Sequence, residues 1–465
     1  MGITGLSDMI KKKCPHVVRP LTNLGVLKGR VLAIDAMVSV HSLLSGVRNN
    51  MAKRLDAERI LSANDDIMAI IEREEAQELA NSFANQAQMF TRNGITVIYV
   101  FDGKAHQCKS QEQAKRREVK DHRRKLAETE AREIIGRSVT IPVVSPKGDD
   151  AGLSQPNADQ EQDVFVTNVV TAVSTVYDAE RLSTALRVYQ QVRKVGDVHI
   201  ACIKKRLAEL PGVAVLIAPG EGERMCSYLC CRGYADALVT NDSDALAMEG
   251  RIMIKGLTGT TEPSVAKPFH IINIRETRLA LGFPGEHGDG AEHSAFVDFC
   301  LLSGSDFDEY SKIPGIGPDT AHKMMLKHGS IEKFLKSSDG SQARRNMKEK
   351  EKETKKPLDF DLARQQFLGP LFASDEEEDA YFDHVAQAIQ ESKDRRSAQQ
   401  QKQQQPDQRP NAADSHQVGQ KRPNYDNSKN MVLMPVKRPR RDTSAATRQV
   451  VPQPQQQQPA RPRPQ

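Results

Sequence analysis

The sequence predicts an α/β fold in which a mostly parallel central sheet is flanked by helices. Short apolar runs alternate with longer amphipathic segments over about the first 290 residues, as strands and helices do in such folds. Four of these runs are followed directly by acidic residues. Ligands of open α/β sheets bind outside the carboxyl ends of the strands, so the acids are expected to meet at one site.

The predicted strands and helices follow from the spacing of apolar residues. Helical spacing covers the segment from about 39 to 93 and returns at about 175–210. A polar stretch at 145–163, containing Gly, Pro, Asp and Gln, predicts a loop or insertion. Six apolar runs are predicted strands: 31–35, 96–101, 213–218, 236–241, 251–255 and 269–274.

The character of the chain changes after residue 290. Residues 294–307 predict a helix that ends at a glycine, and the Gly/Pro-rich sequence IPGIGP follows. From about residue 397 the chain is rich in Gln, Pro, Arg and Asn, a composition that predicts disorder. We therefore divide the chain into five regions: 1–108, 109–212, 213–293, 294–394 and a polar tail at 395–465.

Bulk composition restricts the class of protein. The net charge is only +5 over 465 residues, so a nucleic-acid surface has to be local. The 7 cysteines are scattered without paired CxxC spacing, which is typical of reduced cytosolic or nuclear thiols. No apolar run is long enough to cross a bilayer, and the first residues lack the apolar core of a signal peptide, so no membrane association is expected.

The acids at the predicted strand ends are the main functional candidates. A single Asp after a strand commonly caps the next helix, and that explanation suffices for any one of them. Two pairs spaced two residues apart at strand exits favour a shared site instead. Carboxylate oxygens suit Mg²⁺ and Mn²⁺, and a pair of such ions about 3.5–4 Å apart performs phosphate-ester chemistry. The six acids are Asp35, Asp102, Glu221, Glu223, Asp242 and Asp244, and Asp306 is a seventh that follows a helix.

Two basic or glycine-rich segments are candidates for binding phosphate. Residues 109–125 carry a surplus of Lys and Arg, which favours phosphate binding over a solvated helix with internal ion pairs. Residues 314–318 (PGIGP) resemble a helix–hairpin–helix turn, in which Gly315 and Gly317 let the backbone approach a phosphate. Lys323 and Lys327 would extend that contact, whereas the alternative is a loop that caps an ordinary helix.

The motifs in this order resemble those of the flap endonucleases, the XPG-type structure-specific 5′-nucleases. The resemblance covers about residues 1–390 and rests on MGITGL, VLAIDA, IYVFDGK, APGEGE, TNDSDAL, LLSGSDF and IPGIGPDTA. It implies a PIN-like 5′-nuclease fold with a helical arch and a helix–hairpin–helix element. It also implies that the seven acids hold two Mg²⁺ ions, replaceable by Mn²⁺, with Asp35 and Asp102 farther from the metals than the two pairs.

The resemblance also assigns roles in holding branched or flapped DNA. Lys109 and Arg116 would reach the scissile phosphate from the arch, and a K⁺ ion would be held by backbone carbonyls of the hairpin turn. Gly2 would lie beside the active site, and Arg48 would line a pocket for a one-nucleotide 3′ flap. The complete implied set of DNA contacts is Gly2, His41, Arg48, Lys109, Arg116, Gly315, Gly317, Lys323 and Lys327.

Several features depart from the flap endonuclease pattern. His41 replaces the usual Tyr and is typical of the related 5′→3′ exonuclease branch. The arch region is longer, with the excess at 137–178, and the segment from Asp306 to Gly315 is also slightly longer. Residues 363–372 fit a sliding-clamp motif, but we favour a helix of the nuclease fold. The tail sequences KRP and KRPRR predict nuclear import.

We therefore expect a monomeric, Mg²⁺-dependent 5′ flap endonuclease with 5′→3′ exonuclease activity, acting in DNA replication and repair. A mainly exonucleolytic enzyme of the same family is the alternative within this class. A non-catalytic binder of DNA structures is an alternative of another class, and so is a phosphatase with an aspartyl nucleophile. The phosphatase would require a DxD signature, but Ala36 and Met37 follow Asp35.

Overall fold

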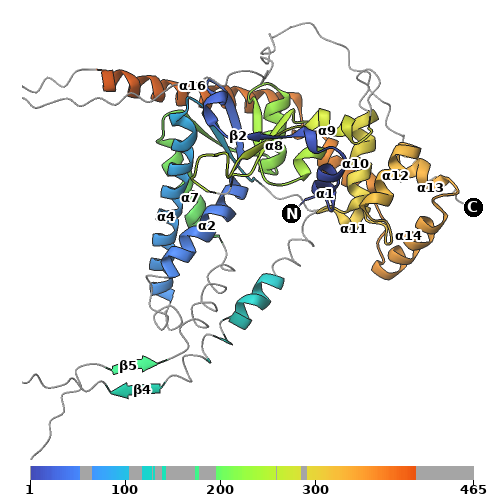
Figure 1. The fold of residues 1–465 in the computed structure, drawn as a ribbon, viewed down its shortest axis with the longest axis horizontal. Coiled ribbons are helices and arrows are strands. Elements are labelled where there is room, and N and C mark those ends of the chain that lie inside the picture. The colour runs from blue at the N-terminus through green and yellow to red at the C-terminus, as the bar shows by residue number, and fades with distance from the viewer. Residues whose placement is uncertain are drawn as a thin grey trace, which may run out of the picture.

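The computed structural model describes residues 2–52, 65–103, 118–127, 129–130, 133, 139–142, 173–176, 195–257, 259–283 and 291–404. Within these residues no helix combines the length and the apolar character needed to span a membrane. Figure 1 shows a central sheet with helices on both of its faces and a group of helices beyond one end.

The sheet has seven strands in the order β1-β9-β8-β7-β2-β3-β6. Strands β8, β7, β2, β3 and β6 run parallel to one another, whereas β9 is antiparallel to both β8 and β1. This arrangement confirms the mostly parallel α/β sheet. The strands are β1 (Val18–Leu21), β2 (Val31–Asp35), β3 (Thr96–Phe101), β6 (Val213–Ile217), β7 (Ala237–Val239), β8 (Ile252–Lys255) and β9 (Phe269–Asn273).

The central strands are buried on both faces, which explains why their sequences are continuous apolar runs. In β2, Leu32 and Ile34 pack in a cluster that includes residues of α2 (Ala36–Ala52), α4 (Asp65–Arg92) and α7 (Asp197–Ala208). Ala33, between them, packs into a second cluster with residues of α1 (Leu6–Lys13) and α8 (Gly222–Cys231). The sheet is therefore the middle layer of three.

The remaining helices gather beyond the end of the sheet (Figure 1). The buried side chain of Asp298 connects three of them, because it pairs with Arg364 at 2.6 Å and accepts the backbone N–H of Ile331 at 3.0 Å. The elements are α9 (Ile274–Ala280), α10 (Ala291–Ser303), α11 (Asp308–Ser311), α12 (Pro318–His328), α13 (Ile331–Lys336), α14 (Ser341–Thr354) and α15 (Phe360–Leu368).

The predicted insertion at 137–178 contains two strands, β4 (Val139–Pro142) and β5 (Val173–Val176), which pair antiparallel with each other. The prediction of helix from about residue 175 is therefore wrong at its start, and the described helix α7 begins at Asp197. The sequence VSTV of β5 is rich in β-branched residues, which favour a strand over a helix. The polar stretch at 145–163 lies outside the described residues.

The last described helix, α16 (Asp375–Gln404), extends past the predicted start of the disordered tail at residue 395. Arg395 donates to the carbonyl of Val213 at 2.8 Å, and Arg396 donates to the carbonyl of Thr91 at 2.5 Å. These bonds attach the first residues of the predicted tail to the nuclease-like core. Amino-acid composition could not predict these hydrogen bonds, because their acceptors are backbone carbonyls. Residues 405–465, with the basic tail sequences, lie outside the described residues.

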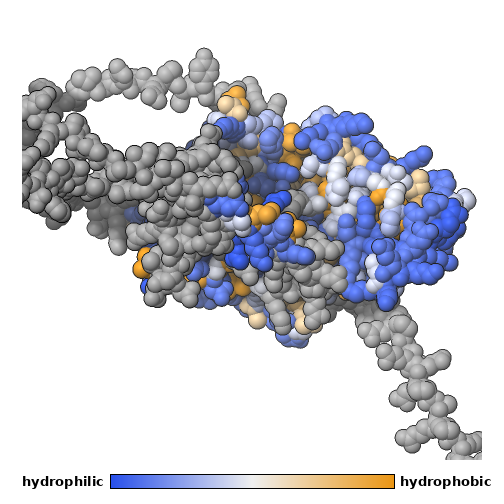
Figure 2. Space-filling model, turned by 90° about the horizontal axis from the view of Figure 1, so that it is seen from below, coloured by the Kyte–Doolittle hydropathy of each residue, from blue (hydrophilic) through white to orange (hydrophobic). Residues whose placement is uncertain are grey.

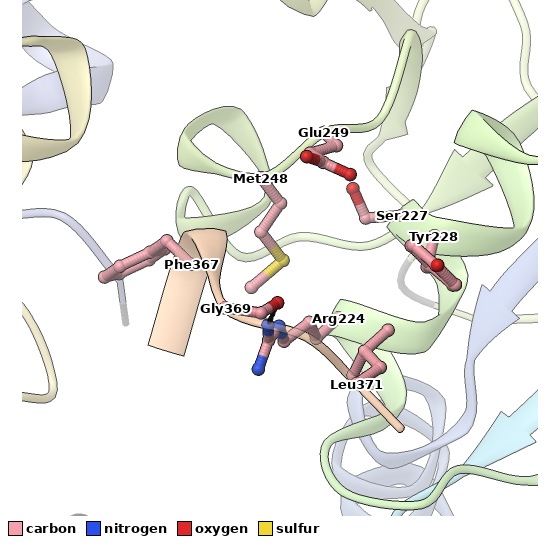
Figure 3. A pocket seen from close by; sticks show the side chains of 8 residues that line it. All are labelled: Arg224, Ser227, Tyr228, Met248, Glu249, Phe367, Gly369 and Leu371. Atoms are coloured by element: carbon pink, nitrogen blue, oxygen red, sulfur yellow. Dashed lines mark hydrogen bonds between the residues drawn. The ribbon is translucent and has the colours of Figure 1, made fainter. Parts of the chain in front are cut away.

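The segment that fits a sliding-clamp motif is part of the fold. Phe367 and Phe372 are buried, and the ring of Phe372 lies 6.2 Å from that of Tyr228 on α8. Figure 3 shows Phe367, Gly369 and Leu371 around a pocket opposite side chains of α8, with Arg224 bonded to the Gly369 carbonyl. The structure thus agrees with the interpretation of 363–372 as an internal element.

Candidate active site

Four adjacent parallel strands, β7, β2, β3 and β6, end at the same edge of the sheet. Asp35 is the last residue of β2, and Asp102 directly follows β3. The loops after β6 and β7 lead to the two acidic pairs. We call these six residues the carboxylate edge: Asp35, Asp102, Glu221, Glu223, Asp242 and Asp244.

Asp35 shows that carboxylates from different strands lie near one another. Its side chain is only 6% exposed and accepts the N–H of Met37 at 2.9 Å. Burial, followed by the negative charges of Asp102 and Asp242, raises the pKa of Asp35 from 3.8 to about 7. Three strand ends therefore contribute to one field of negative charge.

The glutamate pair is positioned by the start of α8, where Glu221 is the N-cap and Glu223 lies in the first turn. Between them, Gly222 donates its N–H to Asp102 Oδ1 at 2.7 Å. A Cβ at Gly222 would lie 2.9 Å from the carbonyl oxygen of Val100, so a larger residue would separate α8 from β3. Glycine at this position lets the helix approach the strand end.

The aspartate pair lies in the turn after β7. The N–H of Asp242 donates to Thr240 Oγ1 at 3.1 Å, and the Thr240 hydroxyl donates to Glu223 Oε1 at 3.4 Å. The N–H of Asp244 donates to Asp242 Oδ1 at 3.3 Å, and Asp244 is 3% exposed. Thr240 thus connects the two acidic pairs across the gap between α8 and β7.

The N-terminal segment lies against the aspartate pair, as the resemblance implied for Gly2. Gly2 has φ +108, and a Cβ there would lie 2.0 Å from Asp242 Oδ1 and 2.4 Å from Ser243 Oγ. Two residues on, Thr4 donates its N–H to the carbonyl of Gly304 at 2.8 Å. Asp306 follows Gly304 by two residues, so this segment connects the loop of Asp306 to the carboxylate edge.

The carboxylate edge fits hard divalent cations in its donor chemistry. Every donor is a carboxylate oxygen, and the raised pKa of Asp35 reports negative charge that a cation would relieve. In the described part of the chain, however, no three His, Cys, Asp or Glu side chains form a group spaced to hold one ion. The assignment of metal ligands within the edge therefore stays a prediction.

Lys255 is a site residue that the sequence did not single out. It ends β8, the parallel neighbour of β7, so it reaches the same edge of the sheet. Burial lowers the pKa of Lys255, and the nearby charges of Asp242 and Glu223 oppose that shift. The sequence could have indicated this residue, because Lys255 ends the predicted strand 251–255 and acids follow the predicted strand before it.

His41 is the predicted DNA contact on the surface of α2 that the structure describes. His41 is exposed on α2, and its pKa is lowered by partial desolvation and then by the charges of Lys120 and Arg48. Residues 118–127, which include the described part of the basic segment, are helical. Lys120 on this helix lies close enough to α2 for its charge to lower the pKa of His41. Lys109 and Arg116 lie outside the described residues.

Arg48, which the resemblance places at a pocket for a 3′ flap, is buried in the structure. Its side chain is 2% exposed and donates to Glu75 Oε1 from both Nε and Nη2, at 3.0 and 2.8 Å. Glu75 also lies 3.0 Å from Nε2 of the buried His199. This network holds α2, α4 and α7 together, so Arg48 cannot line an open pocket for a 3′ flap without disrupting the packing of these helices.

The glycines of the predicted turn are exposed, in the segment 304–318 that connects α10 to α12 and that we call the hairpin. Gly315 has φ +82, and Gly317 is the N-cap of α12. Lys323 and Lys327 are both exposed on α12, but Lys327 pairs with Asp339 at 2.5 Å. Figure 2 shows a mainly hydrophilic surface at the end of the molecule where α12–α14 lie.

The K⁺ ion implied at the hairpin does not fit the carbonyls of the turn. The carbonyl of Ile316 accepts from Lys312 Nζ at 2.8 Å, and that of Pro314 accepts from Asn346 Nδ2 at 2.7 Å. The ammonium group bound to the Ile316 carbonyl repels a second monovalent cation, and the Pro314 carbonyl already accepts from a neutral amide. The K⁺ site stays a prediction, and these contacts weigh against it, because side chains of this protein already bind both carbonyls.

Comparison with known proteins finds two matching domains and relatives similar over most of the chain. Residues 1–123 match the XPG N-terminal domain and residues 212–306 match the XPG I-region. Flap endonuclease 1 of Homo sapiens is 29% identical over 340 residues, which cover 73% of this chain and 70% of that protein. Flap endonuclease 1-2 of Paramecium tetraurelia is 25% identical over 379 residues, covering 81% of this chain and 78% of that protein.

The solved structures that resemble this one are less similar in sequence than the relatives above. The catalytic core of Rad2 in complex with DNA substrate is 16% identical and aligns over 80% of this chain and 88% of that chain, with a TM-score of 0.46. Flap endonuclease-1 from Methanococcus jannaschii is 17% identical over 82% of this chain and 97% of that chain, with a TM-score of 0.38. The chain thus matches two XPG domains and is similar to flap endonucleases over most of its length.

Proposed function

We propose that this protein is a divalent-metal-dependent 5′ flap endonuclease that hydrolyses DNA at junctions of single and double strands, with accompanying 5′→3′ exonuclease activity. The observation that carries the proposal is the carboxylate edge, where acids from four adjacent parallel strands meet. Concentrated negative charge cannot bind a phosphodiester by itself. It becomes a phosphate site once cations bind to it, which is the chemistry of flap endonuclease relatives.

Each group of residues has a distinct task in this proposal. Two bound Mg²⁺ ions, or Mn²⁺ in their place, would supply an activated water and stabilise the charge that develops on the phosphate. The carboxylates at the edge and Asp306 would hold these ions. Thr240 orients Glu223 and Gly222 orients Asp102 through hydrogen bonds. Lys255, Lys109 and Arg116 neutralise the phosphate as the bond to the leaving oxygen breaks.

DNA would be held on two sides of the carboxylate edge. On one side, His41 stacks on a base and the basic segment after residue 108 guides the 5′ single strand. On the other side, the N–H groups beside Gly315 and Gly317, together with Lys323, bind the duplex backbone. Removal of flaps in nuclear DNA replication and repair by a monomeric enzyme is the setting we propose, on the basis of the flap endonuclease relatives and the basic tail.

A mainly exonucleolytic enzyme is the second candidate, and His41 is the observation that favours it. The two candidates differ in substrate preference, so a double-flap DNA is compared with a nicked and a blunt duplex under the same conditions. We expect faster cleavage of the double flap with Mg²⁺ and no cleavage with a chelator. Faster cleavage of the plain duplexes would establish the exonuclease instead.

The catalytic assignment is tested by Asp242→Asn, which removes one negative charge from the carboxylate edge. We expect cleavage to fall by at least about 100-fold, the scale of a lost electrostatic contribution to catalysis, while DNA binding persists. The matched control is Asp236→Asn at the opposite end of β7, where Asp236 pairs with Arg30 and accepts the N–H of Val31. Turnover by Asp242→Asn equal to that of Asp236→Asn would refute the site. Absence of cleavage by every form, the unmodified protein included, together with DNA binding would instead indicate a non-catalytic DNA binder.

A further inference from the structure

We infer that Lys312 is a tethered cation that holds the hairpin in its DNA-binding shape, so that the hairpin works without a bound monovalent ion. The ammonium group of Lys312 donates to three backbone carbonyls: Leu302 at 2.8 Å, Ser303 at 2.6 Å and Ile316 at 2.8 Å. Three acceptors match the three donors of a lysine ammonium. The inference rests on the proposed function only for the role of the hairpin in binding DNA.

The three carbonyls belong to two elements that have to be held together. Leu302 and Ser303 form the last turn of α10, where carbonyls have no partner within the helix and carry partial negative charge. Ile316 lies between the two glycines of the turn. One ammonium therefore joins the end of α10 to the turn. Burial lowers the pKa of Lys312, the charge of Asp308 opposes that shift, and the charge of Lys350 adds to it.

A second lysine fixes the segment that carries Lys312. From α14, Lys350 Nζ donates to the carbonyl of Asp308 at 2.7 Å and to the carbonyl of Lys312 itself at 2.8 Å. Asn346, one turn earlier on α14, donates to the carbonyl of Pro314. The backbone oxygens on the inner side of the hairpin are thus bound by side chains of the protein, and its glycine N–H groups stay on the exposed side.

An ammonium group and a K⁺ ion are equivalent in the features that matter at such a site. Both carry one positive charge and both bind carbonyl oxygens, so they exclude each other from the same small, half-buried cluster. The difference is that Lys312 is covalently part of the chain. Its local concentration is fixed by folding, whereas occupancy by a free ion depends on the salt in solution.

The unmodified protein provides the first measurement. We compare its thermal unfolding and its affinity for duplex-containing flap DNA in KCl, in NaCl and in tetramethylammonium chloride at equal ionic strength. We expect the same melting temperature in the three salts and affinities that agree within about twofold, since only nonspecific screening acts. A K⁺-specific rise in melting temperature, or K⁺-specific tightening of about tenfold or more, would overturn the inference.

The second measurement uses Lys312→Met, which keeps most of the side-chain stem and removes the ammonium. We expect a lower melting temperature and about tenfold weaker DNA binding, since three carbonyls lose their donor. KCl should restore both properties in part, and tetramethylammonium chloride should not, because its cation is too large to enter the cluster. Rescue by an ion of the right size separates a cation site from a merely structural lysine.

Lys348→Met is the matched control, because it removes the same charge from an exposed position on α14. Identical behaviour of the two variants in every salt would refute the role of Lys312. If Lys312→Met does not fold, the inference is still tested by Lys350→Met and by the comparison of salts on the unmodified protein. K⁺-selective stability of Lys312→Met, combined with no DNA binding by any form, would uphold the tethered cation and refute the proposed function.

Discussion

The carboxylate edge and the hairpin are the two parts of the molecule that meet DNA in the proposed function, and they treat buried charge in opposite ways. At the edge, Asp35 is 6% exposed, and burial, followed by the charges of two further acids, raises its pKa. At the hairpin, the half-buried Lys312 is surrounded by three carbonyl oxygens that accept from it. One charge is opposed by its surroundings, and the other is stabilised by them.

The difference follows from what each region has to bind. A site for exchangeable divalent cations has to keep its negative charge in the folded protein, and this repulsion weakens the fold. A turn that presents N–H groups to phosphates needs only a fixed shape, which the chain can supply with its own lysines. The repulsion between carboxylates at the edge and the binding of hairpin carbonyls by lysines of the same chain therefore both follow from what each region has to bind.

The strongest test of this contrast removes one buried charge from each region. Asp35→Asn should raise the free energy of unfolding of the metal-free protein at pH 8 by about 2–3 kcal/mol, because the ionised carboxylate is destabilising there. Lys312→Met should lower it by about 1–3 kcal/mol, because buried carbonyls lose a donor. Chemical denaturation with a chelator present measures both changes.

The pH dependence of Asp35→Asn has a defined sign. Below its ordinary pKa of 3.8, Asp35 is protonated in both the folded and the unfolded protein, so variant and wild type differ least. Between 3.8 and about 7 the folded state binds more protons, so wild-type stability falls relative to the variant as the pH rises. A constant difference across this range, or destabilisation by Asp35→Asn, would contradict a strained carboxylate edge.

A smaller effect is expected from one alanine in each region. Gly2 and Gly315 both have positive φ, at +108 and +82, and a Cβ would meet Asp242 at one and Asn346 Nδ2, at 2.8 Å, at the other. Left-handed backbone costs a non-glycine residue about 1–3 kcal/mol, or about 10- to 100-fold in a rate or a binding constant. Gly2→Ala should lower turnover, whereas Gly315→Ala should weaken DNA binding.

Single-turnover cleavage and fluorescence anisotropy separate these two outcomes. Gly329→Ala is the control, because Gly329 caps α12 with φ +74 but a Cβ there meets nothing within 4 Å. It should reproduce the loss of stability without either functional defect. If Gly2→Ala and Gly315→Ala impaired the same step, the division of labour between the edge and the hairpin would be wrong.

The sequence predicted the sheet well where strands are buried on both faces. VLAID and TVIYVF have apolar residues on both faces, so β2 and β3 were found with their observed bounds. β1 was missed because VRPL has one buried residue, Leu21, and contains a proline. The convergence of the acids was predictable from the same logic, since neighbouring parallel strands end at the same edge.

Arg48 and Lys312 show what pattern and resemblance cannot supply. The partners of Arg48 and its network, Glu75 and His199, come from two other helices, and no local spacing reveals that an arginine is buried by such pairing. The partners of Lys312 are backbone carbonyls, which every residue has and no sequence motif marks. Long-range packing therefore decides both cases, and it argues against the expected 3′ flap pocket and K⁺ site, which stay predictions.

The smallest predicted effect concerns the two exposed lysines that follow the hairpin on α12. Each phosphate contact adds about 0.9 to the slope of log affinity against log salt, so Lys323→Met should lower the magnitude of that slope by about this amount. Lys327→Met should lower it less, because its ammonium pairs with Asp339 at 2.5 Å and a phosphate has to displace that partner. Asp339→Asn should then tighten DNA binding slightly and make the Lys327 contribution equal to that of Lys323. Anisotropy titrations over a range of KCl concentrations measure the slopes, and an unchanged slope in Lys323→Met would remove α12 from the DNA-binding surface while leaving the carboxylate edge untouched.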